Sequence, residues 1–447
     1  MEWARVYQRS EPTVNVYTLS MFRPQAFLTR TLKHHARGHS VTRILAAAMN
    51  AVEPGAAVKR YLEAHPLLRG ERTFAFGLGK AACPMVNSLA HVVDLTNALI
   101  ITKHASRVDP AAAVVIEGDH PIPGESSLTA GRAAKEFVTR LTPDDLLVCL
   151  ISGGGSALMA APLIPLEDLQ MMTSALLVCG ARIDEINTLR RHLDALKGGG
   201  LARAANGARI LSLILSDVVG DSIEAIASGP TAPDPSTCEE AIAILRKYDL
   251  LEKVPASVYE NLRETVKQDD PVFNRVDNHI IASNDLALSA AQLQAEQEGF
   301  QTTIVNQPLQ GEASETGITL ATRLLEEARS RNRSFCLLAG GETTVTIKGN
   351  GRGGRTQELA LGAVEGLSGL DDMMLISIAT DGEDGPTDAA GAVVTGETAP
   401  RAERLGLSAS EHLSRNDAYA FFEPLEDLVR IGPSGTNVND LVLCFAF

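Results

Sequence analysis

Aromatic side chains are scarce in this chain of 447 residues: they make up 4% of the sequence, and Trp3 is its single tryptophan. A core with so few rings must be built mainly from alanine, leucine, valine and isoleucine, which favours tightly packed α/β layers. The same scarcity argues against a binding platform for single-stranded nucleic acid, because such platforms stack bases on aromatic rings.

Paired cysteines are also missing. The six cysteines are scattered, form no C-x-x-C motif, and several lie within apolar runs. Free cysteine in such runs behaves as a small buried hydrophobic residue. We therefore expect thiols in a reducing compartment rather than disulfides. The cysteines are Cys83, Cys149, Cys179, Cys238, Cys336 and Cys444.

The chain also lacks an excess of positive charge and long apolar runs. The formal net charge is −15, and binding to nucleic acid needs a basic face that releases counterions. No run approaches the roughly 18 apolar residues of a membrane span, and the first 20 residues lack the apolar segment of a secretory signal. We expect a cytoplasmic protein with neither a nucleic-acid nor a membrane partner, and a homodimer is an open alternative.

What the chain does contain is a regular alternation of short apolar runs with segments of helical periodicity. The apolar runs are continuous, which is typical of strands covered on both faces. The alternation predicts an α/β fold with parallel strands and right-handed crossovers. The expected strands cover residues 73–76, 98–102, 146–151, 208–215, 279–282, 302–305, 334–339 and 373–379, and the expected crossover helices include 126–141 and 239–246.

The length exceeds what one hydrophobic core usually serves and predicts two domains. A polar, charge-rich stretch at 267–278 separates two well-patterned halves, and we place the boundary there. The predicted parts are an N-terminal extension of unclear role (1–38), a larger N-terminal α/β domain (39–275) and a smaller C-terminal α/β domain (276–447).

The first glycine-rich loop follows the strand at 73–76 and carries Gly77, Gly79 and Lys80. Glycines at a strand end let the backbone approach a phosphate at the next helix N-terminus. The spacing also fits the G-x-G-x-x-A pattern of dinucleotide-binding loops, so a nicotinamide cofactor is an alternative. Against that alternative, the next strand is followed by Lys103 rather than by the acid that would hold a ribose.

The second loop consists of Ser152, Gly153, Gly154, Gly155 and Ser156 and follows the most apolar strand. Three glycines between serines favour a nest that binds anions, and a tight strand–helix turn is the alternative. The loop is not a Walker A motif, because no G-K-[ST] closes it. We predict that it binds phosphate.

Two further segments of the first half carry charge beside glycines. Arg190 and Lys197 lie on one face of a helix that ends in three glycines, and we predict substrate binding for Arg190 and phosphate binding for Lys197. An ordinary surface helix is the alternative. Asp217 and Asp221 follow the strand at 208–215 and suit magnesium or a general base, unless they only cap a helix.

The second half repeats this arrangement. Gly341 and Glu342 follow a strand and are predicted to bind nucleotide, whereas Asp381 opens an acidic loop and is a predicted metal ligand. Arg352 and Arg355 open a helix and suit bidentate recognition of phosphate or carboxylate.

Amide and carboxylate groups precede the last strand. Asn437 and Asp440 lie in this segment, and we predict that they contact the substrate. Any one of these loops could be a plain turn, but their number at strand ends in both halves favours one anion-binding site.

Taken together and in order, these segments resemble the glycerate 2-kinase family, whose C-terminal half is named for an M-O-F-R-L motif. The resemblance covers about 41–447. It departs from the family at Thr356, where asparagine is usual, and at 194–196, where Ser-Ala-Ile is usual. The matching segments are 77–82, 151–157, 187–200, 213–221 with 228–231, 339–344, 353–358, 379–388 and 435–440.

The resemblance implies a Rossmann-like N-terminal domain, a smaller α/β domain and an active site in the cleft between them. It implies transfer of the ATP γ-phosphoryl group to the 2-hydroxyl of D-glycerate, with a divalent metal, taken as Mg²⁺. By motif, Lys80 carries over as the lysine needed for phosphoryl transfer and Arg355 as an active-site arginine. We expect Asp217 or Asp221 to hold the metal or accept the hydroxyl proton. The alternative from another reaction class is an NAD(P)H-dependent hydroxypyruvate reductase.

Overall fold

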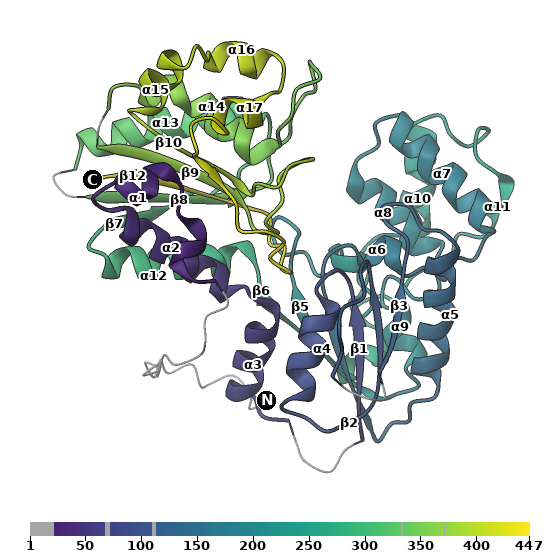
Figure 1. The fold of residues 1–447 in the computed structure, drawn as a ribbon. Helices are drawn as coiled ribbons and strands as arrows, with labels where there is room; N and C mark the ends of the chain where they lie inside the picture. The colour runs from purple at the N-terminus through teal and green to yellow at the C-terminus, as the bar shows by residue number, and fades with distance from the viewer. Residues whose placement is uncertain (1–21, 68–71, 110–112, 332–333, 371) are drawn as a thin grey trace.

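Two six-stranded sheets, each covered by helices, form the protein (Figure 1). The computed structural model describes residues 22–67, 72–109, 113–331, 334–370 and 372–447. The predicted α/β class is therefore confirmed. Within the described residues, no helix has the length and apolar character needed to cross a membrane.

The first sheet has the order β3-β2-β1-β4-β5-β6, and all its neighbouring strands are parallel. Its central strand β4 is buried along its whole length, as its continuous apolar sequence predicts. The bounds are β1 Arg72–Leu78, β2 Leu95–Thr102, β3 Ala113–Glu117, β4 Asp145–Ile151, β5 Arg209–Leu215 and β6 Val276–Ala282.

The second sheet has the order β11-β10-β9-β12-β8-β7 and is mixed. The last strand, β12, lies between β8 and β9 and is antiparallel to both, so the prediction of parallel pairing is wrong here. Among the described strands of this sheet, only β7 and β8 pair in parallel. The sequence misled because β12 is buried on both faces and is as apolar as a parallel strand. The bounds are β7 Gln301–Ile304, β8 Phe335–Gly341, β9 Met373–Ala379, β10 Gly391–Thr395, β11 Leu428–Val429 and β12 Asp440–Ala446.

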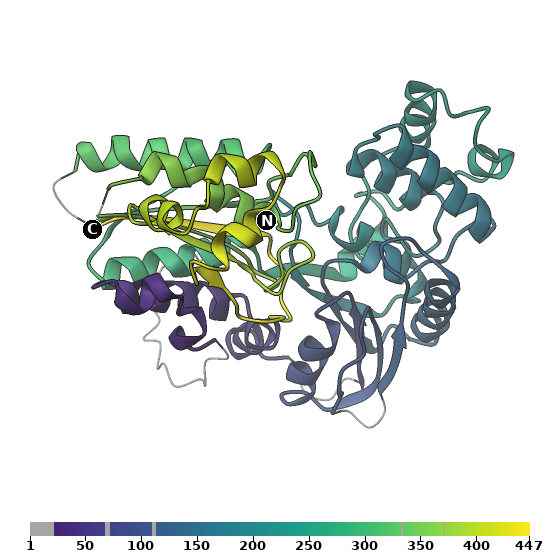
Figure 2. The same cartoon turned by 45° about the horizontal axis from the view of Figure 1, so that its top comes forward.

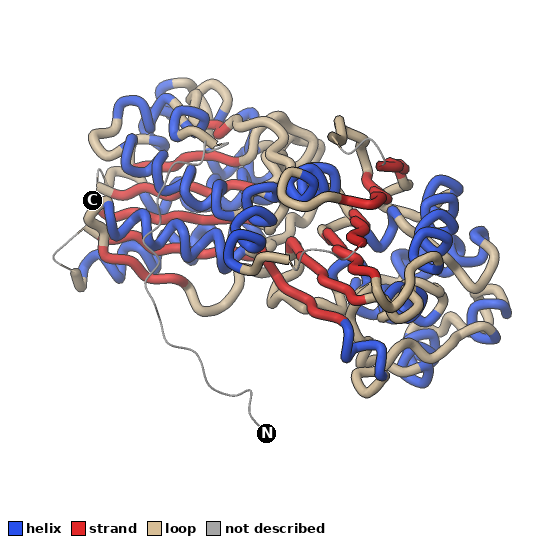
Figure 3. The backbone as a smooth tube through the Cα atoms, turned by 90° about the horizontal axis from the view of Figure 1, so that it is seen from below, coloured by secondary structure: helices blue, strands red, loops and turns tan. Residues whose placement is uncertain are grey.

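Three of the four apolar clusters hold these layers together. One cluster is shared by both sheets and is covered by α2, α3, α4 and α12, while α5 with α9 and α13 with α14 cover the opposite faces. The bounds are α2 Gly38–Ala51, α3 Pro54–Ala64, α4 Ala82–Ala90, α5 Glu125–Thr139, α9 Gly200–Ala204, α12 Asn284–Gln297, α13 Ala313–Arg329 and α14 Arg355–Leu367. Figure 3 shows helices layered along the strands of both sheets.

The fourth cluster belongs to a separate helical group of α7, α8, α10 and α11, which stands apart from both sheets in Figures 1 and 2. The bounds are α7 Leu166–Val178, α8 Ile183–His192, α10 Cys238–Lys247 and α11 Ala256–Glu260. The remaining elements are η1 Pro24–Phe27, α1 Arg30–His34, α6 Gly155–Leu158, η2 Ile226–Ser228, η3 Pro271–Arg275, α15 Thr398–Arg404, α16 Ala409–Ser414 and α17 Ala418–Phe422.

The junction between the halves lies beside the predicted boundary. β6 follows residue 275 but pairs with β5 in the first sheet, and the chain then enters α12, which covers the second sheet. The division at 275/276 stays a prediction, although it separates β6 from its own sheet.

The predicted N-terminal extension is described from residue 22, and residues 1–21 lie outside the described part. Its described residues fold onto the second half. The Thr31 backbone N–H and Oγ1 donate to the Asp427 carboxylate at 2.9 and 2.8 Å, and Arg401 binds the same carboxylate at 2.7 Å.

Candidate active site

A cavity of about 1650 Å³ lies between the two halves of the chain. Its walls are formed by α8 and by the loops that follow β3, β4, β5, β8 and β9. In Figure 1 the loops of the second half project toward the helical group that contains α8. The sequence-predicted residues that line this cavity are Gly154, Ser156, Arg190, Asp217, Glu342, Arg355 and Asp381.

The two glycine loops of the first half interlock beside the cavity. The Lys80 N–H donates to the Gly153 carbonyl at 3.0 Å, and the Ala81 N–H donates to Ser152 Oγ at 3.0 Å. Gly79 has φ +118°, and a Cβ there would lie 2.3 Å from the Ser152 carbonyl oxygen. The glycine is therefore required by backbone packing.

The phosphate-binding role predicted for Gly77, Gly79 and Ser152 stays a prediction, and the structure gives these residues packing roles outside the cavity lining. A Cβ at Gly77 would lie 3.0 Å from Val86 Cγ2, so this glycine allows β1 to pack closely on α4. Ser152 is 1% exposed, and its hydroxyl is already used by the Ala81 N–H. These three residues do not line the cavity, and their packing and hydrogen bonds hold the Lys80 loop in place.

Lys80 is exposed and lies beside three cavity residues. A Cβ built on Gly154 would lie 3.4 Å from Lys80 Cγ and 3.4 Å from His120 Cδ2. The charge of Lys80 lowers the pKa of both His120 and Asp217. No carboxylate of the described residues forms an ion pair with Lys80, so its charge is available to a ligand.

Asp217 lies at the carboxyl end of β5 and lines the cavity. A Cβ on Gly153 would come within 1.8 Å of Asp217 Oδ2, so glycine at 153 makes room for this carboxylate. Burial raises the pKa of Asp217 to about 6, with Lys80 lowering it and Glu342 raising it. Asp221 lies in a left-handed turn with φ +56° and does not line the cavity, which argues against its predicted catalytic role.

The helix after the second glycine loop is fixed by packing. A Cβ on Gly155 would lie 2.6 Å from Ala227 Cβ, so this glycine is a packing requirement and not a ligand contact. Ser156 Oγ lies 2.7 Å from Ser228 Oγ and lines the cavity. Within this loop, Gly154 and Ser156 are the predicted residues that line the cavity.

Arg355 forms the charged centre of the opposite wall. Its Nε and Nη2 donate to the two oxygens of Asp440 at 2.6 and 3.1 Å, and its Nη1 donates to Glu342 at 2.6 Å. Burial opposes its charge, but the hydrogen bonds and charges of Asp440 and Glu342 raise the pKa of Arg355. Asp440 is buried, does not line the cavity and orients Arg355, and its predicted substrate contact stays a prediction.

Asp384 is a structural residue of this wall that the sequence did not single out. Its buried carboxylate accepts the Thr356 and Gln357 N–H groups at 3.1 and 2.9 Å and so fixes the start of α14. A Cβ on Gly354 would lie 2.3 Å from Asp384. The acidic loop around Asp381 was the only signal for it in the sequence.

Four other predicted residues lie away from the cavity lining. Lys197 is buried, and its Nζ donates to Asp194 at 2.7 Å and to the Met159 carbonyl at 2.8 Å, so its charge is neutralised inside the protein. The Arg352 guanidinium stacks on the Tyr419 ring at 4.1 Å. Asn437 Oδ1 accepts the Asn439 N–H at 3.1 Å, and a Cβ on Gly341 would meet the Leu309 backbone at 2.4 Å. The predicted ligand contacts of these four residues stay predictions, and in this structure each residue contacts the protein itself.

Two cavity residues without a predicted role complete the first wall. His120, after β3, and Asn187, on α8, both line the cavity beside Arg190. Burial lowers the pKa of His120, and Lys80, Lys103 and Arg190 lower it further. The signal missed for Asn187 was its spacing of three residues from Arg190 on one helix face.

The cavity also contains the oxygen ligands that magnesium prefers. The carboxylates of Asp217, Glu342 and Asp381 line it, two of them being the predicted metal ligands. Mg²⁺ binds through one or two carboxylates together with substrate phosphates and water. The donor set fits the ion that the family resemblance implies.

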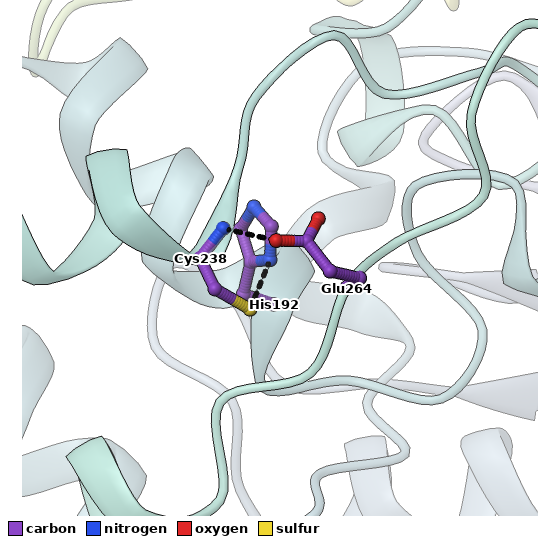
Figure 4. A group of neighbouring side chains, drawn as sticks. All are labelled: His192, Cys238 and Glu264. Atoms are coloured by element: carbon purple, nitrogen blue, oxygen red, sulfur yellow. Dashed lines mark hydrogen bonds between the residues drawn. The ribbon is translucent and has the colours of Figure 1, made fainter.

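A second group of potential metal ligands, His192, Cys238 and Glu264, lies outside the cavity (Figure 4). His192 Nδ1 lies 2.7 Å from the Arg263 carbonyl, and the Glu264 carboxylate accepts the Cys238 N–H at 2.8 Å. Burial, with the charge of Glu264, raises the pKa of the Cys238 thiol to about 11. These contacts already use the ligand atoms, and they describe a hydrogen-bonded junction that ties α10 to the end of α8.

Fold and cavity together define a class: an α/β protein in which strand-end loops of two sheets surround one site for a small anionic ligand. Residues 40–263 match the family described as a domain of unknown function (DUF4147), and residues 335–440 match the MOFRL family. The chain belongs to the glycerate 2-kinase family.

Known relatives cover most of this chain. It is 41% identical to a glycerate 2-kinase of Pyrococcus horikoshii over 83% of this chain and 87% of that protein. It is 39% identical to a putative hydroxypyruvate reductase of Agrobacterium vitis over 89% and 92%. The crystal structure of a glycerate kinase from Thermotoga maritima superposes with a TM-score of 0.86 at 38% identity, covering 91% of this chain and 99% of that one.

Proposed function

We propose that this protein transfers the γ-phosphoryl group of ATP to the 2-hydroxyl of D-glycerate and releases 2-phosphoglycerate and ADP. The observation that carries the proposal is the cavity between the halves, where cations of one wall without a described ion-pair partner face carboxylates of the other. Phosphoryl transfer depends on positioning and charge neutralisation, and this arrangement supplies both. Relatives named as glycerate kinases, which match over most of the chain, support the choice of acceptor.

The first half is proposed to form a Rossmann-like domain and the second a smaller α/β domain, with the active site in the cleft between them. The all-parallel order β3-β2-β1-β4-β5-β6 supports the first assignment, because Rossmann folds have this strand order. The loops that line the cavity follow the carboxyl ends of β4 and β5, where ligands bind in such sheets.

In the reaction, Gly154 and Ser156 bind ATP phosphates and Lys80 stabilises the migrating phosphoryl group. Arg355, oriented by Asp440 and Glu342, binds phosphate from the second wall. Asp217 accepts the proton of the 2-hydroxyl or binds Mg²⁺, which would neutralise phosphate charge. Asp381 lies in the same cavity and is the second proposed metal ligand.

Closure of the two walls would exclude water and suppress ATP hydrolysis. Ile183 of α8 and Ile347 of the loop after β8 support this step. Both line the cavity from opposite halves, yet 67% and 82% of their surfaces are exposed. An approach of the walls would bury this apolar surface.

The test is ADP release on addition of D-glycerate to protein, ATP and Mg²⁺, followed by phosphorus NMR to place the phosphate on carbon 2 or carbon 3. Absence of glycerate-dependent ADP release would overturn the proposal. Hydroxypyruvate with NADH tests the reductase alternative by the loss of absorbance. We expect no oxidation, because Lys103 follows β2 where a nicotinamide-binding site would place an acid.

A further inference from the structure

Two neighbouring side chains on α8 point polar atoms into buried space without a partner. Asn187 Oδ1 and Arg190 Nε are both buried, and neither has a hydrogen-bond partner among the described residues. The two residues are three positions apart, hence on one helix face, and both line the cavity. A buried polar atom without a partner is destabilising, and a ligand that supplies the missing hydrogen bond would remove that cost.

The next residue on α8 shows the contrast. Arg191 is buried against Asp234, with Nε 2.9 Å from the carboxylate, so its charge has a partner inside the protein. Arg190 forms no ion pair with any described carboxylate, although the chain has a net charge of −15. The guanidinium of Arg190 therefore has no carboxylate partner among the described residues and can bind an anionic ligand.

The loop facing α8 is rigidly built. A Cβ on Gly118 would lie 2.1 Å from the Leu158 carbonyl oxygen, so the backbone of this loop packs directly on α6. The Asp119 carboxylate accepts the Ser126 N–H at 3.0 Å and caps α5, and the Pro123 carbonyl accepts Gln170 Nε2 at 2.8 Å. His120 is thereby held in the cavity, within electrostatic reach of Arg190.

We propose that Asn187 determines acceptor specificity: its side-chain oxygen accepts a hydrogen bond from the 3-hydroxyl of D-glycerate while Arg190 binds the carboxylate. This inference rests on the proposed function and assigns the acceptor end of the same cavity. The acceptor has a carboxylate that needs donors and two hydroxyls that need acceptors, and the 2-hydroxyl must face the phosphoryl group near Lys80. The hydroxyl that remains matches the free oxygen of Asn187.

The spacing of the two side chains agrees with this assignment. Residues three apart on a helix have Cβ atoms about 5–6 Å apart, a distance that a three-carbon acid can span. The charge pattern agrees as well, because Arg190 with Lys80 and Lys103 surrounds the position of His120 with cations. His120 contributes an uncharged ring, which bounds the acceptor site without competing for the carboxylate.

The assignment predicts a specific form of selectivity. A site that hydrogen-bonds a substrate hydroxyl rejects the analogue that lacks it much more strongly than an apolar pocket does, because its own polar group is left unpaired. D-lactate keeps the carboxylate and the 2-hydroxyl of D-glycerate but lacks the 3-hydroxyl. The wild-type protein is therefore expected to discriminate against D-lactate by roughly 10³-fold or more in kcat/KM.

The experiment compares D-glycerate with D-lactate for the wild-type protein, Asn187→Ala, Asn187→Asp and the control Asn97→Ala, which alters an exposed asparagine of β2. ADP release gives kcat/KM for each acceptor, and inhibition by D-lactate replaces turnover where turnover is too slow. Asn187→Ala should lose about 10–100-fold with D-glycerate and should react with D-lactate at least as well as the wild-type protein, because no side-chain oxygen is then left unpaired. Asn187→Asp keeps an acceptor oxygen and should retain the preference, even if pairing with Arg190 weakens both acceptors.

Equal losses for both acceptors in Asn187→Ala, or a loss that appears in the KM for ATP, would overturn the assignment and move Asn187 to the nucleotide or to the packing of α8. Circular dichroism and thermal unfolding show whether each variant keeps the helix content and stability of the wild-type protein. If the wild-type protein releases no ADP with D-glycerate, the proposed function fails instead, which this series separates from a failure of Asn187 alone.

Discussion

Both walls of the cavity contain basic side chains, but these side chains differ in whether a carboxylate of the protein pairs with them. In the first wall, Lys80 and Arg190 form no ion pair with any carboxylate that the structure describes. In the second wall, Arg355 is held by Asp440 and Glu342 through three hydrogen bonds. The first wall therefore offers charge to a ligand, whereas the second uses part of its charge to fix its own geometry.

This difference explains which residues should affect chemistry and which should affect folding. An unpaired cation contributes little to stability, so its removal should affect turnover. Removal of one member of a buried ion pair leaves the other charge without compensation and is strongly destabilising. The following substitutions test the contrast in order of their expected effect on turnover.

Lys80→Ala should have the largest effect. Loss of the cation next to Asp217 and Gly154 removes stabilisation of the migrating phosphoryl group, and we expect kcat to fall by roughly 10³-fold or more. Lys59→Ala, which alters an exposed lysine of α3, is the matched control and should behave like the wild-type protein. Near-normal turnover of a folded Lys80→Ala protein would remove Lys80 from the mechanism.

Arg355→Ala should reduce both turnover and stability, in contrast to Lys80→Ala. It leaves the buried Asp440 carboxylate without its partner, and we expect the free energy of unfolding to fall by about 3 kcal/mol. The double variant Arg355→Ala/Asp440→Asn should recover part of the stability in urea denaturation but none of the activity. If the double variant is no more stable than Arg355→Ala, the pair does not have the role assigned to it.

The pH dependence should report Asp217. Burial raises its pKa to about 6, so the carboxylate is protonated below that pH and ionised above it. The ionised form is the one that binds a metal or accepts a proton, and kcat/KM should therefore fall about tenfold per pH unit below pH 6. Asp217→Asn should be nearly inactive and should lose this limb of the profile; an unchanged profile would assign the titration to another group.

Lys197→Met should have the smallest effect on turnover. The lysine is buried against Asp194 and does not line the main cavity, so the KM for ATP should change by less than about 3-fold while stability falls by about 3 kcal/mol. Thermal unfolding together with steady-state kinetics measures both quantities. A large rise in the KM for ATP without loss of stability would instead show that Lys197 contributes to phosphate binding.

The sequence alone located the strand-end loops, and the structure brings four of them to one cavity: those at 154–157, 217–219, 342–345 and 381–386. The sequence predicted β4 and α10 correctly, because the spacing of their apolar residues matches the faces that are buried in the structure. It missed the direction of β12, because a strand buried on both faces has the same composition in either orientation.

Within the loops, the sequence could not distinguish glycines that line the cavity from glycines that are required because another part of the chain packs against them. Gly79 and Gly155 are required because a Cβ would meet the Ser152 carbonyl or Ala227, whereas Gly154 lines the cavity. The same holds for charge: Arg190 lies on α8, which ends at His192, whereas Lys197 lies in a turn beyond it, so the predicted common helix face is wrong. Only the structure shows that Asp194 neutralises Lys197.

Local chemistry, carried by residue type and order along the chain, thus determined the α/β class, the loops that surround the site and the kind of ligand that they attract. Tertiary structure decided which cations remain unpaired, which glycines line the cavity, and the order and direction of the strands in the second sheet. The physical reason is that pairing and burial depend on contacts between segments far apart in the sequence, such as Arg355 with Asp440 or Gly153 with Asp217, and no local pattern encodes those distances.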